Sequence, residues 1–420
     1  MEIEIPEFCL IMLVGCSGSG KTSFAARHFR ETEIVSSDHC RALICDDEND
    51  QNVNEAAFEL VHFIVERRLA ARKLTVVDAT SLEESSRQEL RKLAKEHHAV
   101  VIAVVLTVCL KELKARLAAR PDRHFPAEVL ERQFKLMERS KHRLEKEGFR
   151  HVHLLEGNNI QTAVFSRRKM RPDWSHVPGP FDLIGDVHGC IHELKLLLAK
   201  LGYQLSESEP FEVVPPEGRH LFFLGDLVDR GPDSPQVLRV VMDLVKQGHA
   251  FCLMGNHEAK LLRKLSGHGV KPSHGLEITL QQLEGASSSF LERIRQFFES
   301  MESHYVLDEG RLVAAHAGMP ENMQCRETGA VHAFGLYGKS SGKVDERGFP
   351  IRLDWASDYE GHALVVYGHT PVATAEWRHN TICIDTGCVF GGELTALRYP
   401  EMELVSVPAE RIYYQPGEKV

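Results

Sequence analysis

The segment between residues 185 and 258 carries three short polar motifs, each placed directly after a run of apolar residues. They read GDVHGC at Gly185–Cys190, GDLVDRG at Gly225–Gly231 and GNHE at Gly255–Glu258. Apolar runs of this kind are typical of buried strands, and the ends of neighbouring strands bring polar side chains to one edge of a sheet. The pattern therefore predicts an α/β domain with a polar site at the carboxyl ends of its strands.

Two histidines further along the chain stand in the same kind of position. His316 follows the apolar residues 312–315, and His369 follows the apolar residues 363–367. Carboxylates, an amide and imidazoles together suit hard or borderline divalent metals such as Mn, Fe or Zn. An aspartate of the middle motif would be able to bridge two ions about 3.5–4 Å apart, the arrangement used for phosphoester displacement.

Taken in order across residues 182–392, these motif blocks resemble the calcineurin-like metallophosphoesterase superfamily. The resemblance implies two divalent ions, and Mn²⁺ is the expected metal. The implied ligands of the first ion are Asp186, His188 and Asp226. The implied ligands of the second ion are Asp226, Asn256, His316 and His369.

The same resemblance implies catalytic roles for three more residues. Arg230 would bind the phosphate, because a guanidinium fork matches phosphate oxygens. His257 would protonate the leaving oxygen, and Asp229 would orient the imidazole ring of His257.

Near the N-terminus, residues 15–22 read GCSGSGKT and match G-x-x-x-x-G-K-[ST]. The motif lies between a predicted strand at residues 8–14 and an amphipathic helical pattern at residues 24–29. Glycines let backbone N–H groups surround phosphates, and the following helix adds its dipole. Lys21 is expected to reach the β- and γ-phosphates of ATP, and Thr22 to bind Mg²⁺. The predicted nucleotide-binding residues are Gly15, Ser17, Gly18, Ser19, Gly20, Lys21 and Thr22.

Four residues beyond this P-loop are candidates for phosphoryl transfer. Asp38 lies just past the second predicted strand, where a carboxylate accepts the proton of an attacking hydroxyl; a turn cap is the alternative. Arg116, Arg120 and Arg123 cluster around a proline and are expected to bind ATP, with Arg120 stabilising the transferring phosphoryl group. A solvated basic face is the alternative for these arginines.

Strands and helices alternate through the first half of the chain, which predicts a parallel sheet with helices on both faces. We expect a P-loop kinase domain at residues 1–160, a basic and Pro/Gly-rich linker at 161–180, and an α/β metallophosphoesterase domain at 181–420. Helical apolar spacing over residues 259–305 predicts a helical insertion beside the metal site.

Over residues 8–156, the chain resembles the kinase module of bacterial polynucleotide kinase–phosphatases, through the P-loop, Ser37–Arg41 and the arginine cluster. That resemblance implies that Asp38 is the general base and that Arg41 contacts the phosphate next to the acceptor hydroxyl. The segment Ile384–Gly392 is similar to the phosphatase module of the same family, where Asp385 would support the site without binding metal. An ordinary turn is the alternative for Asp385.

The resemblance also implies a function in RNA end healing. The kinase would phosphorylate a 5′-hydroxyl end of RNA, or of DNA, and the phosphatase would remove a 2′,3′-cyclic or a 2′ or 3′ phosphate. Nicked tRNA is the expected type of substrate. The ligase module of that family, with its K-x-D-G lysine, has no match here. A separate or missing ligase is therefore the expected partner, and an RNA 3′-terminal methyltransferase is a further candidate.

Composition sets broad limits on this interpretation. The chain has 420 residues, 43% of them hydrophobic and 26% charged, as in globular proteins with two or three domains. The sequence contains no run of about 18 apolar residues, so we expect no membrane span. Ten cysteines without a C-x-x-C pair predict the reducing cytoplasm. The net charge of −10 does not by itself indicate nucleic-acid binding, and a homodimer is one candidate oligomeric state.

Two other functions fit the same motifs. One is a metabolite kinase fused to a dinucleoside polyphosphate hydrolase. The other is a signalling protein, in which the P-loop senses a nucleotide and the phosphatase acts on phosphoserine or phosphothreonine. Salt-sensitive binding to short RNA would favour end healing over both.

Overall fold

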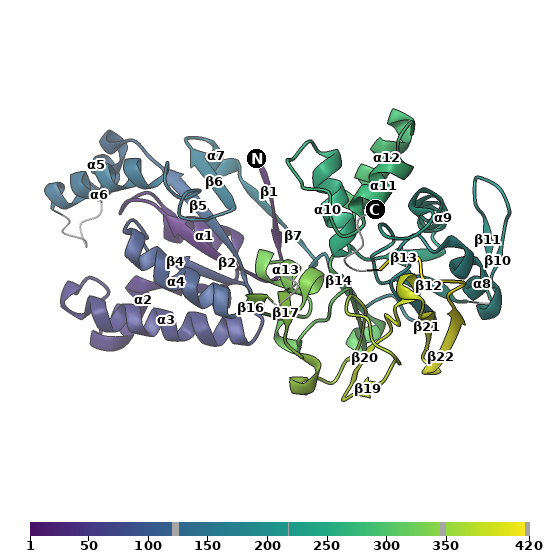
Figure 1. The fold of residues 1–420 in the computed structure, drawn as a ribbon. Helices are drawn as coiled ribbons and strands as arrows, with labels where there is room; N and C mark the ends of the chain where they lie inside the picture. Colours follow the sequence, from purple (N-terminus) through teal and green to yellow (C-terminus); the bar gives the residue numbers. More distant parts are fainter. Residues whose placement is uncertain (120–125, 217, 345–349, 416–420) are drawn as a thin grey trace. The chain divides into compact units, whose positions relative to one another are not determined.

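The computed structural model describes residues 1–119, 126–216, 218–344 and 350–415, and the chain divides into two compact units (Figure 1). The first unit consists of Met1–Met170 together with Arg326–Thr328. The second unit consists of Arg171–Cys325 and Gly329–Val420. Each unit contains its own sheets and its own candidate site.

The first unit is built on a five-stranded sheet in the order β3-β4-β2-β5-β6, in which every neighbouring pair is parallel. Its strands are β2 (Cys9–Val14), β3 (Ile34–Ser36), β4 (Thr75–Asp78), β5 (Val100–Thr107) and β6 (His151–Glu156). The central strand β2 has the sequence CLIMLV and is buried at every residue. A strand that is covered on both faces has no solvent side, so it is apolar throughout rather than alternating.

Helices alternate with these strands as the sequence predicts. They are α1 (Lys21–His28), α2 (Ser37–Cys45), α3 (Asn54–Ala70), α4 (Glu84–Glu96), α5 (Leu110–Ala118), α6 (Ala127–Ser140) and α7 (Asn159–Thr162). The prediction of an N-terminal α/β unit with a parallel P-loop sheet is therefore confirmed.

The structure differs from the predicted linker over residues 161–180. In this segment β7 (Val164–Arg168) pairs with β1 (Glu2–Pro6), and β8 (Asp173–Trp174) pairs with β14 (His304–Leu307). Two basic residues there are held in ion pairs. Arg167 donates two hydrogen bonds of 2.7 Å to the Glu33 carboxylate, and Arg168 lies 2.6 Å from Glu327. The segment is therefore made of paired strands and ion-paired arginines rather than a solvated connection.

The second unit contains two larger sheets and two short hairpins. One sheet has the order β13-β12-β9-β21-β22, and the other has the order β19-β20-β18-β15-β14-β8. Strands of the first sheet are β9 (Phe181–Ile184), β12 (His220–Phe223), β13 (Ala250–Cys252), β21 (Glu393–Tyr399) and β22 (Glu403–Pro408). The second sheet adds to β8 and β14 the strands β15 (Leu312–Ala315), β18 (Leu364–Tyr367), β19 (Trp377–Arg378) and β20 (Thr381–Cys383). The hairpins pair β10 (Gln204–Leu205) with β11 (Val213–Val214), and β16 (Ser340–Val344) with β17 (Pro350–Arg352).

Alternate residues of these strands face different cores, which makes the second unit a sandwich. Leu183 and Phe222 of the first sheet join Leu312 and Val366 of the second sheet in one apolar cluster. The neighbours of these residues on each strand enter a different cluster; Phe223, for example, packs with helical residues. Because successive side chains of a strand point to opposite faces, each sheet is covered on both sides. This confirms the predicted α/β metallophosphoesterase fold.

Helices complete the second unit. They are α8 (Ile191–Leu201), α9 (Ser234–Lys246), α10 (Asn256–Leu265), α11 (Leu276–Gln282), α12 (Ser288–Glu299) and α13 (Gly329–Tyr337). Between β13 and β14, α10, α11 and α12 form the predicted helical insertion, and Figure 1 shows these three helices together. No helix in the described ranges has the length and apolar character needed to cross a membrane.

Candidate metal centre and nucleotide site

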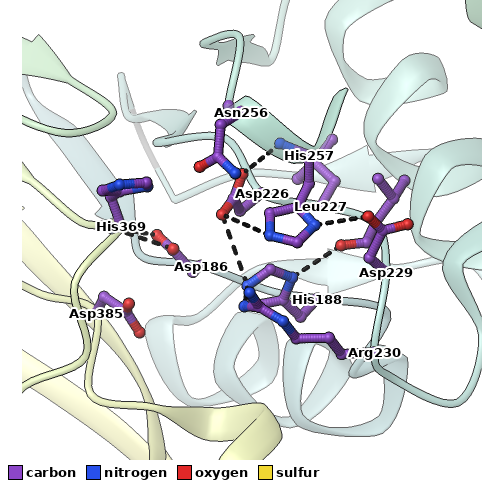
Figure 2. Close-up of polar contacts among 12 residues, drawn as sticks. Asp186, His188, Asp226, Leu227, Asp229, Arg230, Asn256, His257, His369 and Asp385 are labelled. Carbon is purple, nitrogen blue, oxygen red and sulfur yellow. Dashed lines mark hydrogen bonds and ion pairs between the residues drawn. The ribbon is translucent and has the colours of Figure 1, made fainter. Parts of the chain in front are cut away.

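Polar residues of the second unit lie just past the carboxyl ends of strands from both sheets (Figure 2). In the first sheet, Asp186 follows β9, Asp226 follows β12 and Asn256 follows β13. In the second sheet, His316 follows β15 and His369 follows β18. The stacked sheets thus bring Asp186 and His369, which are 183 positions apart, into hydrogen-bond contact at one site.

Two of the motif segments approach each other closely beside Asp226. A Cβ atom at Gly225 would lie 2.7 Å from the backbone nitrogen of Gly255, so a larger residue would push the strand ends apart. Glu258 is fully buried and accepts hydrogen bonds of 2.8–3.2 Å from four backbone N–H groups. The donors are Asp226, Leu227, Val228 and Gly255. Burial and the neighbouring Asp226 raise the pKa of Glu258 to about 8, whereas these four donors favour its charged form.

Backbone carbonyls fix the orientation of two histidines in the centre. Nδ1 of His188 lies 2.8 Å from the carbonyl oxygen of Val228, and Nδ1 of His316 lies 2.9 Å from that of Leu224. A carbonyl oxygen only accepts, so both rings carry their proton on Nδ1. The Nε2 lone pair of each ring is therefore directed to the centre, which is the form in which imidazole binds a metal.

Asp226 stands between the two groups of ligand atoms. One carboxylate oxygen lies 3.6 Å from Nε2 of His188, and the other lies 3.4 Å from Nε2 of His316. Nε2 of His316 in turn lies 3.1 Å from Oδ1 of Asn256 and 3.0 Å from Nδ1 of His369. The central position predicted for Asp226, beside ligands of both proposed ions, matches this arrangement.

Asp186 makes contacts that differ from those expected of a ligand of the first metal ion. Its carboxylate accepts hydrogen bonds of 3.1 and 3.2 Å from the backbone N–H of His369. Within the described residues, the tight group around His188 and Asp226 has His257 as its third member instead of Asp186. Asp385 lies beside Asp186 and accepts a hydrogen bond of 3.1 Å from the N–H of Gly387, so the alternative of a turn also has structural support.

Electrostatics provide a test of whether these residues fit metal ions. Burial raises the pKa of Asp226 to about 7 and that of Asp385 to about 6, and it raises the pKa of Asp186 well above its usual value. Burial also lowers the pKa of His316 to about 3, so this ring is neutral. Nε2 of His369 is buried, and the described residues offer it no hydrogen-bond partner. Buried carboxylates beside neutral imidazoles form a site that bound dications would stabilise.

The donor set therefore fits two divalent ions, with Asp226 shared between them. The residues that would hold these ions are Asp186, His188, Asp226, Asn256, His316 and His369. Oxygen and nitrogen ligands of this type are compatible with Mn²⁺ as well as with Fe or Zn.

A buried chain of hydrogen bonds supports His257. Its Nδ1 lies 2.6 Å from Oδ2 of Asp229, and Thr279 donates a hydrogen bond of 2.7 Å to the other oxygen of Asp229. Nε2 of His257 lies 3.9 Å from Asp226. Burial raises the pKa of Asp229 to about 7 and lowers that of His257, and the short contact between them lets Asp229 hold the imidazole through Nδ1.

Arg230 lies on another side of the centre. Its guanidinium donates a hydrogen bond of 2.7 Å to Nε2 of His188. The guanidinium carbon lies 5.3 Å from the ring centroid of Phe390 and 5.9 Å from that of Tyr414. The Nε atom of Arg230 is buried and has no hydrogen-bond partner in the part of the chain that the structure describes. A cation held in this way between aromatic rings is suited to bind an anion beside the metal ligands.

The P-loop of the first unit connects β2 to α1 and borders a cavity of about 410 Å³. Nζ of Lys21 donates hydrogen bonds of 2.9 Å to the carbonyl oxygens of Gly15 and Cys16. Five of the predicted nucleotide-binding residues line this cavity, namely Ser17, Gly18, Gly20, Lys21 and Thr22. Asp78, at the end of β4, lines it as well.

The wall of this cavity also contains Asp38 and Arg41, which form an ion pair with each other. Arg41 also donates a hydrogen bond of 2.9 Å to Asn54. Asp38 lies in the first turn of α2, beyond the N-cap Ser36, so it does not cap this helix.

Among the predicted arginines, Arg116 reaches the P-loop. Its guanidinium lies 3.4 Å from the carbonyl oxygens of both Gly18 and Ser19. Arg120 and Arg123 lie outside the described residues, so their predicted roles stay predictions.

Comparison with known families agrees with this geometry. A model described as calcineurin-like phosphoesterase matches residues 179–405, which is more than half of the 420 residues. The chain belongs to the calcineurin-like phosphoesterase family. A second model, described as AAA domain, matches residues 10–144 and covers the P-loop unit. The protein therefore joins a P-loop kinase domain to a metallophosphoesterase.

Several curated relatives of the phosphoesterase part share the name asymmetrical bis(5′-nucleosyl)-tetraphosphatase PrpE. The chain is similar to PrpE of Anoxybacillus flavithermus, with 48% identity over 56% of this chain and 96% of that protein. It is 47% identical to PrpE of Geobacillus thermodenitrificans, over 54% of this chain and 94% of that protein. With PrpE of Halalkalibacterium halodurans, the identity is 43% over 55% of this chain and 94% of that protein.

Three residues in or beside the phosphoesterase site were not predicted from the sequence. Glu258 belongs to the GNHE motif, but its partners are backbone N–H groups, which no pattern of side chains reveals. Thr279 lies on α11, and its contact with Asp229 depends on how that helix packs. Arg352 lies on the short strand β17, outside every motif, and lines a cavity together with His369.

Proposed function

We propose that the phosphoesterase unit hydrolyses dinucleoside tetraphosphates asymmetrically, to a nucleoside monophosphate and a nucleoside triphosphate. The observation that carries this proposal is the similarity to PrpE, which extends over nearly the full length of those relatives. This favours the dinucleoside polyphosphate hydrolase, considered above as an alternative, over RNA end healing.

The geometry of the site is compatible with this chemistry. Bound divalent ions supply Lewis acidity and an activated water for attack at phosphorus. Arg230 binds the non-bridging oxygens of the reacting phosphate. His257 gives its Nε2 proton to the leaving phosphate oxygen, while Asp229 holds the ring through Nδ1 and stabilises the imidazolium before transfer. Exclusion of water from these buried groups strengthens each interaction.

For the P-loop unit, we propose a Mg²⁺-ATP-dependent kinase that phosphorylates a hydroxyl group of a small metabolite. Asp38 accepts the proton of that hydroxyl, and its ion pair with Arg41 holds the carboxylate at the acceptor side of the cavity. Lys21 and Arg116 neutralise the phosphate charges of ATP. A 5′-hydroxyl RNA end remains the competing acceptor.

The test is a substrate panel with Mg²⁺ and Mn²⁺, in which ATP is added to the RNA and peptide reactions and omitted from the dinucleotide reaction. It contains diadenosine tetraphosphate, RNA with 5′-hydroxyl and 2′,3′-cyclic phosphate ends, and a phosphoserine peptide. We expect equal amounts of AMP and ATP from the dinucleotide, with this activity lost in Asp226→Ala and kept in Lys21→Ala. Two equivalents of ADP would refute asymmetrical cleavage. Conversion of both RNA ends without dinucleotide hydrolysis would instead establish end healing.

A further inference from the structure

A cavity of about 480 Å³ in the phosphoesterase unit begins beside the metal centre. His369 and Thr370 line it, and so do three cationic side chains, Lys339, Arg352 and Arg378. Figure 2 shows His369 and Arg230 on different sides of Asp226. The cavity therefore extends from the metal centre on the His369 side, away from the arginine that binds the reacting phosphate.

The three cations of this cavity differ in their partners. Arg378 lies 2.6 Å from the carboxylate of Asp354, and Lys339 lies 3.5 Å from that of Asp358. Among the residues that the structure describes, no carboxylate lies within ion-pair distance of Arg352. Burial lowers the pKa of Arg352, so its guanidinium is partly removed from water, with no paired anion among the described residues. Such a group gains free energy when an anionic ligand enters.

Arg352 lines the same cavity as His369, one of the residues that would hold a metal ion. It therefore lies where a phosphate chain that continues from the centre into the cavity would pass. A guanidinium fork is well matched to the oxygens of such a chain.

Aromatic residues form another part of the wall. The rings of Trp355 and Tyr367 lie with their centroids 5.1 Å apart, and both residues line the cavity. Gly318 packs directly on Trp355, because a Cβ atom there would overlap with the indole ring. This contact keeps the indole fixed. Aromatic rings next to cations are the chemistry that recognises a nucleoside and its phosphates.

We propose that this cavity is the subsite for the second nucleotide of the substrate, with Arg352 binding the phosphates beyond the scissile bond. This inference rests on the proposed function, because only a substrate with a nucleotide on each side of the reacting phosphorus needs a second subsite. The nucleoside lies against Trp355 and Tyr367. Arg352 is a binding residue for the extended substrate and is not needed to bind a single phosphate at the metal centre.

The experiment compares two substrates in the full-length, Mn²⁺-loaded protein: diadenosine tetraphosphate and p-nitrophenyl phosphate, which has no second nucleotide. For Arg352→Gln, we expect the KM of the dinucleotide to rise about tenfold or more, the loss expected when a charged hydrogen bond to phosphate is removed. The KM and kcat for p-nitrophenyl phosphate should stay within about twofold. Lys343→Ala is the matched control, because Lys343 is exposed on the same hairpin but does not line the cavity.

Each outcome bears on a different claim. Equal losses on both substrates would overturn the subsite and place Arg352 at the reacting phosphate. Unchanged KM values for both substrates would show that the cavity does not hold the second nucleotide. A wild-type protein that hydrolyses p-nitrophenyl phosphate but not the dinucleotide would refute the proposed function itself. Competitive inhibition of p-nitrophenyl phosphate hydrolysis by ATP, weakened about tenfold in Arg352→Gln, would support the subsite independently of dinucleotide turnover.

Discussion

Replacing Glu258 by glutamine tests whether this residue holds the metal centre together. The glutamine side chain has nearly the same volume, but one of its two terminal atoms becomes an NH₂ group, which cannot accept a hydrogen bond. The best rotamer keeps the oxygen near the N–H groups of Asp226 and Gly255, at 2.8 and 3.0 Å. The NH₂ group then faces the N–H groups of Leu227 and Val228, which lose their acceptor.

The expected loss of stability follows from the number of N–H groups that lose their acceptor. Each buried N–H group that loses its acceptor costs about 1–3 kcal/mol, so Glu258→Gln should lower the free energy of unfolding of this unit by about 3 kcal/mol. The same N–H groups set the backbone position of Asp226, the shared ligand. Loss of such support for a ligand typically weakens metal affinity by about 10–100-fold, and we expect a change in that range for Mn²⁺.

Urea denaturation, followed by tryptophan fluorescence, measures the free energy of unfolding of the second unit selectively. All three tryptophans, Trp174, Trp355 and Trp377, belong to the second unit, so the signal reports on this unit alone. Calorimetric titration of the metal-free protein with Mn²⁺ measures its affinity for this ion. Glu284→Gln is the matched control, because Glu284 is exposed and should change stability by less than about 0.5 kcal/mol. If Glu258→Gln left both the urea midpoint and the Mn²⁺ affinity at control values, the assigned role of Glu258 would be wrong.

Three further variants separate the roles of other groups. Thr279→Val removes the hydroxyl that donates to Asp229; we expect kcat to fall about tenfold with KM nearly unchanged, and Thr279→Ser to restore it, in steady-state assays. Asp226→Ala removes the carboxylate between the two ligand groups, so equilibrium dialysis should show loss of tightly bound Mn²⁺, and retention of two ions would contradict the assignment. Lys21→Ala should abolish kinase activity and weaken ATP binding in calorimetry, while phosphoesterase rates stay within about twofold; loss of both activities in a folded variant would refute independent sites.

Much of the fold was predictable because its signals are local. Strand β2 is an unbroken apolar run, so it was located to within one residue of its observed bounds. The paired strands in the predicted linker were not predictable. Strand β8 has only two residues, and the carboxylates that pair with Arg167 and Arg168 lie 134 and 159 positions away in sequence. Nothing in the local sequence distinguishes such arginines from solvated ones.

In the candidate site too, some features follow from the local sequence, whereas others depend on contacts between distant segments. Asp226 and His316 stand directly after apolar runs, so their position at strand ends follows from sequence alone. The identity of the residues that support this site does not follow from the sequence. Glu258 acts through backbone N–H groups, and Arg352 reaches the cavity from a three-residue strand. Both contacts depend on packing between segments whose relative positions are set only in the folded chain.

Several motif residues of the site have a left-handed backbone conformation that could not be predicted from the sequence. His188, Asp226, Asp229, Arg230 and His369 have φ values of +45°, +47°, +74°, +69° and +73°. For residues with a Cβ atom, this left-handed region costs about 1–2 kcal/mol each, so hydrogen bonds must hold these turns in place. The N–H of His188 donates to the carbonyl of Asp226 at 2.8 Å, that of Asp226 donates to Glu258, and that of His369 donates to Asp186. Each strained turn that directs a ligand is thus fixed by another part of the same site, so weakening one contact should displace several ligands together.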